Sequence, residues 1–555
     1  MTSRPILLSG YASKKCPRIT HNDYDPTVPE PPPMDTPQHL QRLFDLGNAH
    51  EPAVFANWLQ TGTDVVDLRP VSSSKTAHIA ATVQAMTNGR AVILGGRLPD
   101  DLIGGRTGKP DVLIRAANGS GYHPVDVKAH MVLEKKHDGG LVADVTAPAL
   151  ADARVSTVGL RYNQDDLLQL AHYWRMLQAC HHHAAEPWGA IIGTDSGPGA
   201  QLAWYDLTEP LFTTFSRTAG TKKRSALERY DHEHDFRVRV AAVAQQQSGA
   251  PADPEPLVQP LGQEDCNTCR WTPVCVDQLP EKDLTRELGG TLSVREYLAL
   301  RKQAIATVDD LVGADLDTLL DSDYADDTSD RSNRKARLYK AHMSAVLARD
   351  GVMLRLKPDA IFDVPRADVE IDLDMESTRE GRVYLWGALV TRDGVSSYTA
   401  FGEMNVYDAP SELAVAQRCF DWLVATHPSA LVFHYHSVEK SHAKRILGAA
   451  VSRYTGTVAD PESWIDLLPP TRECLDSRDG HSLKFVATES GAFHWRDEDP
   501  GGRQSQEWLD EARAGADVAW TRILVYNEDD VLATLQLRKW LRQVTAGLTQ
   551  PGSTA

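Results

Sequence analysis

The N-terminal half of the chain carries two aspartates and a lysine whose spacing suits metal-dependent hydrolysis of a phosphodiester. Asp111 opens one apolar segment, and Asp126 and Lys128 lie two residues apart in the next. Residues two apart in a strand share one face. Two carboxylates can hold Mg²⁺ or Mn²⁺, and the lysine can orient or help to deprotonate an attacking water. The competing interpretation of D-x-K by itself is an exposed hairpin with scattered charges.

A second acidic group lies in the C-terminal part of the chain. Asp374 and Glu376 form D-x-E at the end of an apolar segment. Tyr526 and Asp530 lie four residues apart in the amphipathic segment ILVYNEDDVLATLQLRKWLRQV. The first pair shares a strand face and the second pair a helix face. The sequence therefore combines a D-x-E strand with a Y-x-x-x-D helix.

The seven cysteines do not read as a disulfide framework in a chain of this size. Three of them cluster as C-x2-C-x5-C at Cys266, Cys269 and Cys275, while Cys16 stands alone near the start of the sequence. The other three fall in ordinary segments and are interpreted as structural.

The elements that must position the first group are a β-hairpin and two helices. KPDVLIRAANGSGYHPVDVKAH predicts two strands around a turn at Asn118-Gly119. Upstream, LFDLGNAHEPAVFANWL predicts a helix with Gly47 and His50. Downstream, DLLQLAHYWRML predicts a helix that carries Gln169 and Tyr173 on one face.

The second group is framed by a meander of strands. VEIDLDMES, RVYLWGALV and VSSYTAFGE predict three strands, followed by the helix SELAVAQRCFDWLVATH with Ser411 as its N-cap and by the strand ALVFHYH. Together with the amphipathic closing helix, this order predicts an RNase H-like α/β fold.

Length and composition indicate what kind of protein this is. The 555 residues are about three to four times a typical domain. No apolar run approaches roughly 18 residues and no signal peptide is recognisable, so we expect a cytoplasmic multidomain protein without a membrane partner.

The net charge of −18 argues against binding nucleic acid by bulk charge. Lys222, Lys223 and Arg224 form a local basic stretch, interpreted either as a DNA contact or as a solvated face.

The N-terminal motifs resemble the RecB-type nucleases of the PD-(D/E)XK superfamily. The shared order is G-x-x-H on a helix, Pro110-Asp111, D-x-K and Q-x-x-x-Y. The resemblance implies metal ligands at His50, Asp111 and Asp126, a catalytic lysine at Lys128, and a helix that supports the site and DNA through Gln169 and Tyr173. Glu51 is an alternative to His50, and His78 a weaker one.

The cysteine pattern resembles the iron–sulfur branch of these nucleases. An early cysteine followed by C-x2-C-x5-C after the Q-x-x-x-Y helix implies a structural [4Fe–4S] cluster on Cys16, Cys266, Cys269 and Cys275. Such a cluster would join the start of the chain to the end of the nuclease domain. Structural Zn²⁺ on the same four thiolates is the alternative.

The C-terminal motifs resemble the DnaQ-like, DEDDy-type 3′–5′ exonucleases. That family holds two metal ions with four acidic residues, and its tyrosine positions the attacking water. The resemblance implies ligands at Asp374, Glu376 and Asp530 and a catalytic Tyr526. The middle motif departs from the family, because HYHSVEKSHAKRIL offers Glu439 where an aspartate is usual. Asp372 and Asp466 are further acidic candidates.

As a whole, the chain resembles a bacterial family of nucleases with an α/β multidomain fold. The expected parts are a RecB-type PD-(D/E)XK domain (1–280), a helical helix-hairpin-helix-like segment (281–355) and an RNase H-like exonuclease domain (356–548). We expect a metal-dependent DNA nuclease that acts on single-stranded ends, in DNA repair or defence. No G-x-x-x-x-G-K-[ST] occurs in the sequence, so a helicase would be a separate partner. A ribonuclease that acts on RNA and a DNA-binding accessory protein are the alternatives.

Overall fold

The computed structural model describes most of the chain as two compact units, 1–338 and 339–555. The described residues are 4–31, 50–60, 64–71, 74–134, 139–194, 201–358, 360, 364–497 and 501–548. Gly47, predicted to lie on the His50 helix, is outside them. None of the helices in these ranges has the length and apolar character needed to cross a bilayer. The domain boundaries expected at residues 280 and 355 stay predictions.

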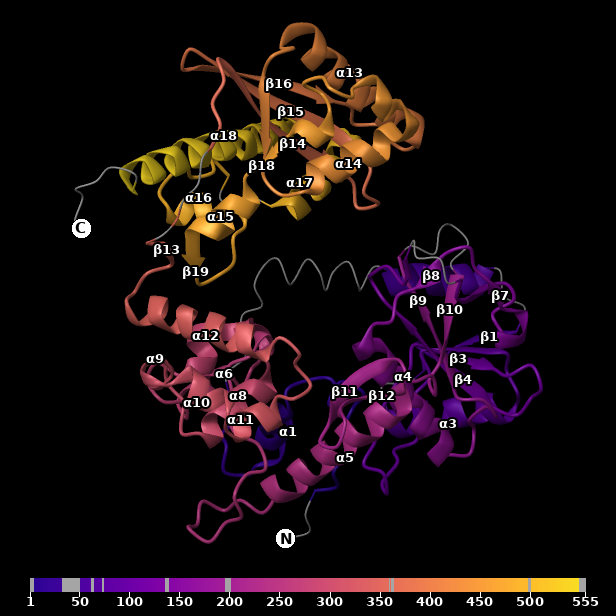
Figure 1. Ribbon diagram of the computed structural model, residues 1–555. Helices are drawn as coiled ribbons and strands as arrows, with labels where there is room; N and C mark the ends of the chain where they lie inside the picture. The colour runs from indigo at the N-terminus through magenta and orange to yellow at the C-terminus, as the bar shows by residue number, and fades with distance from the viewer. Residues whose placement is uncertain are drawn as a thin grey trace. The chain divides into compact units, whose positions relative to one another are not determined.

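The first unit is built on an eight-stranded mixed sheet (Figure 1). Its strands follow the order β1 (Val65–Asp67), β2 (Val92–Leu94), β3 (Val112–Arg115), β4 (Tyr122–Val127), β9 (Trp188–Ile192), β10 (Gln201–Asp206), β6 (Leu141–Asp144) and β7 (Arg154–Val155). β1 runs parallel to β2, and β4 runs parallel to β9, while the other neighbours are antiparallel. The predicted hairpin is β3 and β4, and Gly119 adopts the positive φ of +73° that its turn requires.

Helices flank this sheet and bring distant parts of the unit together. Residues 50–60 are helical, and α3 (Lys75–Thr87) precedes β2. α4 (Gln164–Ala179) starts at Asn163, whose side chain accepts two backbone N–H groups, and most of its side chains are buried. α5 (Ala226–Ala244) starts with a capping box at Ser225 and packs against α1 (Pro17–Tyr24). The start of the sequence therefore lies against a helix more than 200 residues later.

Short helices follow the sheet. They are α6 (Thr272–Val276), α7 (Leu284–Leu288), α8 (Val294–Lys302), α9 (Val308–Gly313), α10 (Leu316–Leu320), α11 (Asp323–Asp327) and α12 (Arg334–Arg349). Arg337 donates two hydrogen bonds to the buried carboxylate of Glu296, which ties α12 to α8. A two-stranded hairpin, β11 (Phe212–Ser216) and β12 (Gly220–Arg224), precedes α5.

The second unit contains a five-stranded sheet in the order β16-β15-β14-β17-β18. β14 (Val369–Ser377), β15 (Val383–Arg392) and β16 (Val395–Gly402) form the predicted antiparallel meander. β17 (Leu431–His434) and β18 (Ile465–Asp466) continue the sheet in parallel with β14. The register of β14 against β15 shifts between Glu376 and Ser377, which places an irregularity at the D-x-E motif.

Helices surround this sheet, and the long α18 (Asp517–Leu548) packs along β14 and β15 (Figure 1). The others are α13 (Ala409–Thr426), α14 (Val438–Leu447), α15 (Leu468–Cys474), α16 (Leu483–Glu489) and α17 (Gly502–Arg513). The predicted N-cap of α13 was wrong. Asp408 caps this helix, and Ser411 occupies its third position, because Pro410 is tolerated in the first turn and does not delay the start.

A buried ion-pair network fixes α18 against β14. Arg538 is fully buried and donates two hydrogen bonds to Asp372, at 3.1 and 2.7 Å, and another to Glu370. Arg542 donates to both carboxylate oxygens of Glu370, at 3.0 and 2.8 Å. Two charged pairs buried in this way set the position of the helix along the strand.

Candidate active sites

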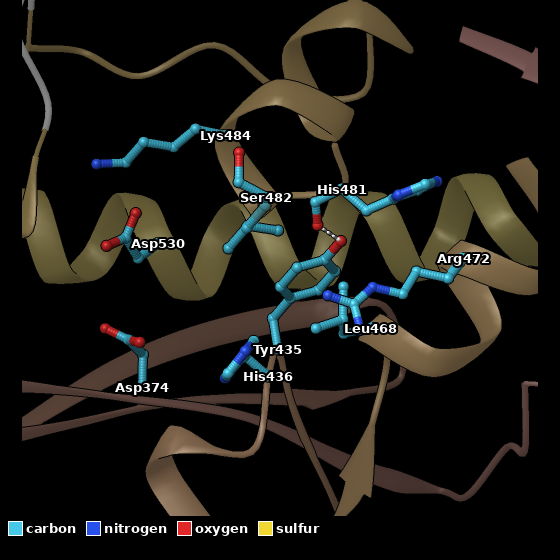
Figure 2. Close-up of a pocket in the computed structure, with 10 residues that line it drawn as sticks. Asp374, Tyr435, His436, Leu468, Arg472, His481, Ser482, Lys484 and Asp530 are labelled. Atoms are coloured by element: carbon cyan, nitrogen blue, oxygen red, sulfur yellow. Dashed lines mark hydrogen bonds between the residues drawn. The ribbon is translucent and has the colours of Figure 1, made fainter. Parts of the chain in front are cut away.

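Three carboxylates of the second unit converge where α18 crosses the end of β14. Asp374 and Glu376 come from β14 and Asp530 from α18, and one oxygen of each lies within 4.8 Å of the others. Among the described residues this is the only group of three metal-ligating side chains so close together. Glu376 and Asp530 are buried, and Asp374 is partly exposed at a pocket (Figure 2).

The charges of this group are unfavourable without a cation. Burial, and then the neighbouring carboxylates, raise the pKa of Asp374 well above its usual range. The same two causes raise the pKa of Glu376 to about 8. Burial raises the pKa of Asp530 to about 6, even though the Lys484 ammonium opposes the change. Oxygen ligands of this kind fit Mg²⁺ or Mn²⁺, whose positive charge would offset the repulsion.

Tyr526 lies one turn of α18 before Asp530, and its hydroxyl is held by a lysine. Lys484 Nζ of α16 donates a 2.8 Å hydrogen bond to the Tyr526 oxygen and lies 4.6 Å from the centre of its ring. Burial and the nearby carboxylates raise the pKa of Tyr526, so it stays a neutral hydroxyl. The sequence reasoning did not find Lys484, which stands in SLKFV without a motif.

Neighbouring side chains orient each carboxylate. Asn527 Nδ2 donates to Asp374 Oδ2 at 2.7 Å, and Tyr398 in turn donates to Asn527 Oδ1 at 2.7 Å. Ser505 Oγ of α17 donates to Glu376 Oε2 at 2.6 Å. Trp495 Nε1 donates to Asp530 Oδ1 at 2.7 Å. These donors compensate part of the buried negative charge and fix the rotamers of the ligands.

Asn527 fits only because the facing strand lacks a side chain. A Cβ atom on Gly387 of β15 would lie 1.8 Å from Asn527 Oδ1. Any larger residue at 387 would therefore displace the amide that holds Asp374. Sequence reasoning missed this glycine, since its role depends on a contact with a helix more than 100 residues later.

Glu439 lies near the group but outside it. It is buried at the start of α14, where burial raises the pKa of its carboxyl. Its carboxylate lies 3.3 Å from His434 Nδ1, and its charge contributes to the raised pKa of Asp374. The other two acidic candidates have partners of their own. Asp372 accepts hydrogen bonds from Arg538, and Asp466 Oδ1 accepts the backbone N–H groups of His436 and Leu468. Glu439 as fourth ligand stays a prediction.

Two adjoining hollows open onto the carboxylates. The larger, of about 450 Å³, is lined by Asp374 and Asp530 together with Tyr435, Arg472, His481 and Lys484. Figure 2 shows Tyr435 with its hydroxyl bonded to the His481 carbonyl, and Arg472 lines the same hollow. The smaller, of about 290 Å³, runs past Glu376, Glu439 and Gln506. The two hollows share Asp374, Asp530, Tyr435 and His436, so they adjoin at the carboxylates, and the larger one also contains basic side chains.

The sheet of the first unit assembles the predicted D-x-K site. Asp126 of β4 is fully buried, and Lys128 Nζ lies 2.6 Å from its Oδ2. Asp111, which directly precedes β3, accepts the Val127 N–H of β4 with its Oδ2 at 2.8 Å, and this contact brings it next to the strand that carries Asp126. Burial and the Asp126 charge raise the pKa of Asp111 well above its usual range. Asp126 Oδ1 is buried without a hydrogen-bond partner among the described residues.

α4 contributes the predicted glutamine and tyrosine to the same site. Gln169 Oε1 accepts a 3.1 Å hydrogen bond from Lys128 Nζ, and Gln169 Nε2 donates to the Tyr173 hydroxyl at 3.2 Å. Tyr173 itself donates to the Lys109 carbonyl, two residues before Asp111. The Q-x-x-x-Y helix therefore contacts the D-x-K strand directly.

His50 lies at the same end of the sheet. It contacts the backbone of Gly193, which follows β9 next to β4, and its Nε2 is buried without a partner among the described residues. Burial lowers the pKa of His50, which favours the neutral imidazole that can ligate a metal. Glu51 also affects Asp111, because its charge adds to the raised pKa of that carboxyl. His78 Nε2 lies 2.8 Å from the Gly95 carbonyl. Metal binding by His50 stays a prediction.

The structure gathers the four cysteines of the predicted cluster, hereafter the cysteine knuckle (Cys16, Cys266, Cys269 and Cys275). None of them forms a disulfide. Gln263 donates to the sulfurs of Cys16 and Cys266, and Asn22 donates to Cys275 Sγ. Burial, and then the other thiols, raise the pKa of Cys16. The chain thus brings Cys16 to the three cysteines that follow the sheet.

The predicted basic stretch forms strand β12 of an exposed hairpin. Lys222 and Lys223 are exposed, and Lys223 Nζ donates to the Leu211 carbonyl. Arg224 is half-buried, and its Nε donates to Thr214 Oγ1. Two ammonium groups therefore face solvent, and contact with nucleic acid at this hairpin stays a prediction.

Comparison with known proteins identifies the second unit. Residues 371–542 match the family RNase_H_2 of the RNase_H superfamily. No curated protein matches the chain, and no solved structure does. The matched segment runs from β14 to α18 and contains all three clustered carboxylates. Proteins of this superfamily are in general metal-dependent nucleases, and residues 371–542 of this chain form an RNase H-like domain that contains a cluster of three carboxylates.

Proposed function

We propose that this protein is a metal-dependent nuclease with two phosphodiesterase centres, acting on the ends of single-stranded DNA. The observation that carries the proposal is the group of Asp374, Glu376 and Asp530, which lies in an RNase H-like domain with two of its members buried and opens to a pocket. In its fully charged form such a group is unfavourable unless a divalent cation binds. Two adjoining hollows, which share Asp374 and Asp530 in their lining, give a polynucleotide strand access to it.

In the C-terminal centre, Asp374, Glu376 and Asp530 would hold two divalent ions with Glu439. Bound ions of this kind activate a water and stabilise the leaving oxygen. Tyr526 contributes a neutral hydroxyl whose oxygen accepts from Lys484 and which donates to Asp530, so the hydroxyl is fixed beside the ligands that would hold the attacking water. Lys484 also places a positive charge beside the carboxylates, where the phosphate must lie.

The larger hollow supports a single strand as substrate. Tyr435 offers an aromatic ring, and Arg472 and Lys484 offer cations, within one pocket of about 450 Å³. Single-strand binding sites combine stacking on aromatic rings with cations that follow the backbone. We therefore place the last nucleotides of a 3′ end in this hollow, with the scissile phosphate at Asp374 and Asp530.

In the N-terminal centre, Asp111, Asp126 and His50 would hold the metal, and Lys128 would act on the attacking water. The contacts of Lys128 with Asp126 and Gln169 support this role, since they fix the ammonium at the buried carboxylate. Tyr173 supports Gln169 from the same helix. This arrangement agrees with a RecB-type PD-(D/E)XK domain.

For the cysteine knuckle we propose a [4Fe–4S] cluster rather than zinc. Tetrahedral zinc with Zn–S bonds of about 2.3 Å would hold its sulfurs about 3.8 Å apart. Among the described residues only Asp374, Glu376 and Asp530 bring three ligand atoms within 4.8 Å of one another, so no three of the four sulfurs lie that close, and neither do His50, Asp111 and Asp126, which would have to close on a bound ion. The larger cluster accommodates a wider arrangement of thiolates.

The test is cleavage of end-labelled single-stranded DNA with Mn²⁺ by protein purified without oxygen. Wild type runs beside Asp126→Ala, Asp374→Ala and the double variant, each also on RNA of the same sequence. Loss of cutting in one or both single variants supports the proposal and says which centre works. No metal-dependent cutting of either polymer refutes it, and cutting of RNA alone makes the protein a ribonuclease. Brown protein supports the cluster, whereas colourless protein with bound zinc refutes it.

A further inference from the structure

The segment from Gly10 to Cys16, hereafter the strap, runs between the N-terminal centre and the cysteine knuckle. Just before it, Leu8 exchanges backbone hydrogen bonds with Gly105 and Thr107. At Gly10 the strap passes so close to α4 that a Cβ atom would lie 3.3 Å from Gln169 Cγ. At its other end it supplies Cys16 to the knuckle.

The strap brings a second lysine to the D-x-K site. Lys14 Nζ donates a 2.7 Å hydrogen bond to Gln169 Oε1, the atom that also accepts a 3.1 Å bond from Lys128 Nζ. Lys14 Nζ also lies 4.4 Å from the centre of the Tyr11 ring. Two ammonium groups therefore converge on one amide oxygen, beside the buried Asp126.

This convergence carries an electrostatic repulsion between the two ammonium groups. Part of that repulsion is offset by Asp126, Asp165 and Asp166. An ammonium group has three donors, and the bond to Gln169 takes one of those of Lys14. A phosphodiester placed over the metal-binding aspartates would accept from both lysines and relieve the repulsion.

The far end of the strap is fixed by Asp265, which directly precedes Cys266 of the knuckle, and by Arg237 of α5. Lys15 Nζ lies 2.9 Å from Asp265 Oδ1, and the Cys16 N–H donates to Asp265 Oδ2 at 3.2 Å. Arg237 of α5 donates to the Lys15 carbonyl at 2.6 Å. Lys14 is held between this anchor and its bond to Gln169, so its position depends on both.

We propose that Lys14 is a second phosphate-binding residue of the N-terminal centre, delivered by the strap and held there by its anchor on Asp265. The inference rests on the proposed nuclease function of that centre and extends it. The ligand is a phosphate of the bound single strand, next to the one that is cut.

The first experiment measures binding of a single-stranded DNA oligonucleotide in Ca²⁺, at several salt concentrations, in an Asp374→Ala background. Lys14→Ala should bind about tenfold more weakly, because a charge-assisted bond is lost. The slope of log K against log salt should fall by about 0.7, the value for one phosphate contact on a single strand. Lys14→Arg should restore both quantities. Lys75→Ala, an exposed lysine paired with Asp100, is the matched control. An unchanged salt slope in Lys14→Ala overturns the proposal.

The second experiment tests whether Asp265 anchors the strap. It also distinguishes a failure of the Lys14 proposal from a failure of the proposed nuclease centre. Asp265→Asn should speed tryptic cleavage after Lys14 and Lys15 severalfold and weaken DNA binding, while the thermal unfolding of the unit stays cooperative. Unchanged cleavage and binding refute the anchor. Lys128→Ala in the same background reports on the centre itself. If it abolishes cutting while Lys14→Ala behaves as wild type, only the strap inference fails. If Lys128→Ala cuts normally, the proposed centre fails.

Discussion

Replacement of Glu376 by glutamine should change how the stability of the second unit depends on pH. In the metal-free protein the pKa of Glu376 is raised to about 8, against an ordinary value near 4.5. The folded state therefore holds a proton that the unfolded state releases, and stability falls as pH rises from about 4.5 to about 8. Glutamine keeps the shape of the side chain and can still accept the Ser505 hydrogen bond, but it has no proton to lose.

The size of the effect follows from the same two values. At about 1.4 kcal/mol for each pH unit, the gap from 4.5 to about 8 gives a ceiling of about 5 kcal/mol. Asp374 and Asp530 share the repulsion with Glu376, so we expect about half of this ceiling. For a unit of this size, about 2.5 kcal/mol corresponds to roughly 5–10 °C in Tm.

The assay is differential scanning calorimetry of the full chain in EDTA between pH 5 and 8.5. Wild type should lose stability relative to Glu376→Gln as pH rises, whereas Glu473→Gln, an exposed glutamate of the same unit, should follow wild type. With Mn²⁺ the order should reverse at high pH, because the ion binds the deprotonated carboxylates. Parallel pH profiles of wild type and Glu376→Gln in EDTA would refute the reasoning.

Three further predictions concern single contacts. Tyr526→Phe, assayed with the N-terminal centre silenced, should lower the turnover of the C-terminal centre about tenfold to a hundredfold with little change in KM; an unchanged kcat would contradict a role in positioning water. Arg538→Met leaves the buried Asp372 without its partner, so the free energy of unfolding measured in urea should fall by about 3–5 kcal/mol. A fall below about 1 kcal/mol would show that this ion pair does not hold α18. Lys222→Glu with Lys223→Glu should weaken DNA binding and flatten its salt dependence, and unchanged binding would make the hairpin a solvated face.

Much of the candidate C-terminal site could be predicted from local patterns. Asp374 and Glu376 end an alternating strand, and Tyr526 and Asp530 share a helix face, so spacing alone predicts that each pair points one way. The hairpin of the first unit could be predicted in the same way, because Asn118-Gly119 specifies its turn. These signals depend on residues within about one turn or one strand of each other.

The remaining parts depend on contacts between distant segments. Lys484 meets Tyr526 across 42 residues, and Asn527 meets Asp374 across 153. Nothing in the residues around Lys484 distinguishes it from a solvated lysine. Gly387 has a role only through the amide it leaves room for. Tertiary packing determines such partners, so they cannot be predicted from a pattern of residues that are close in the sequence.

The anchoring of the strap has a consequence for synthesis of the protein. Lys15 and Asp265 are 250 residues apart, and α1 rests on α5. On the ribosome the start of the chain cannot take its final place until Asp265 and the last cysteine have left the exit tunnel. A nascent chain carrying β3, β4 and α4 would thus still lack its ordered Lys14. Completion of the N-terminal centre is in this way a late step of co-translational folding, governed by closure of a loop of 250 residues.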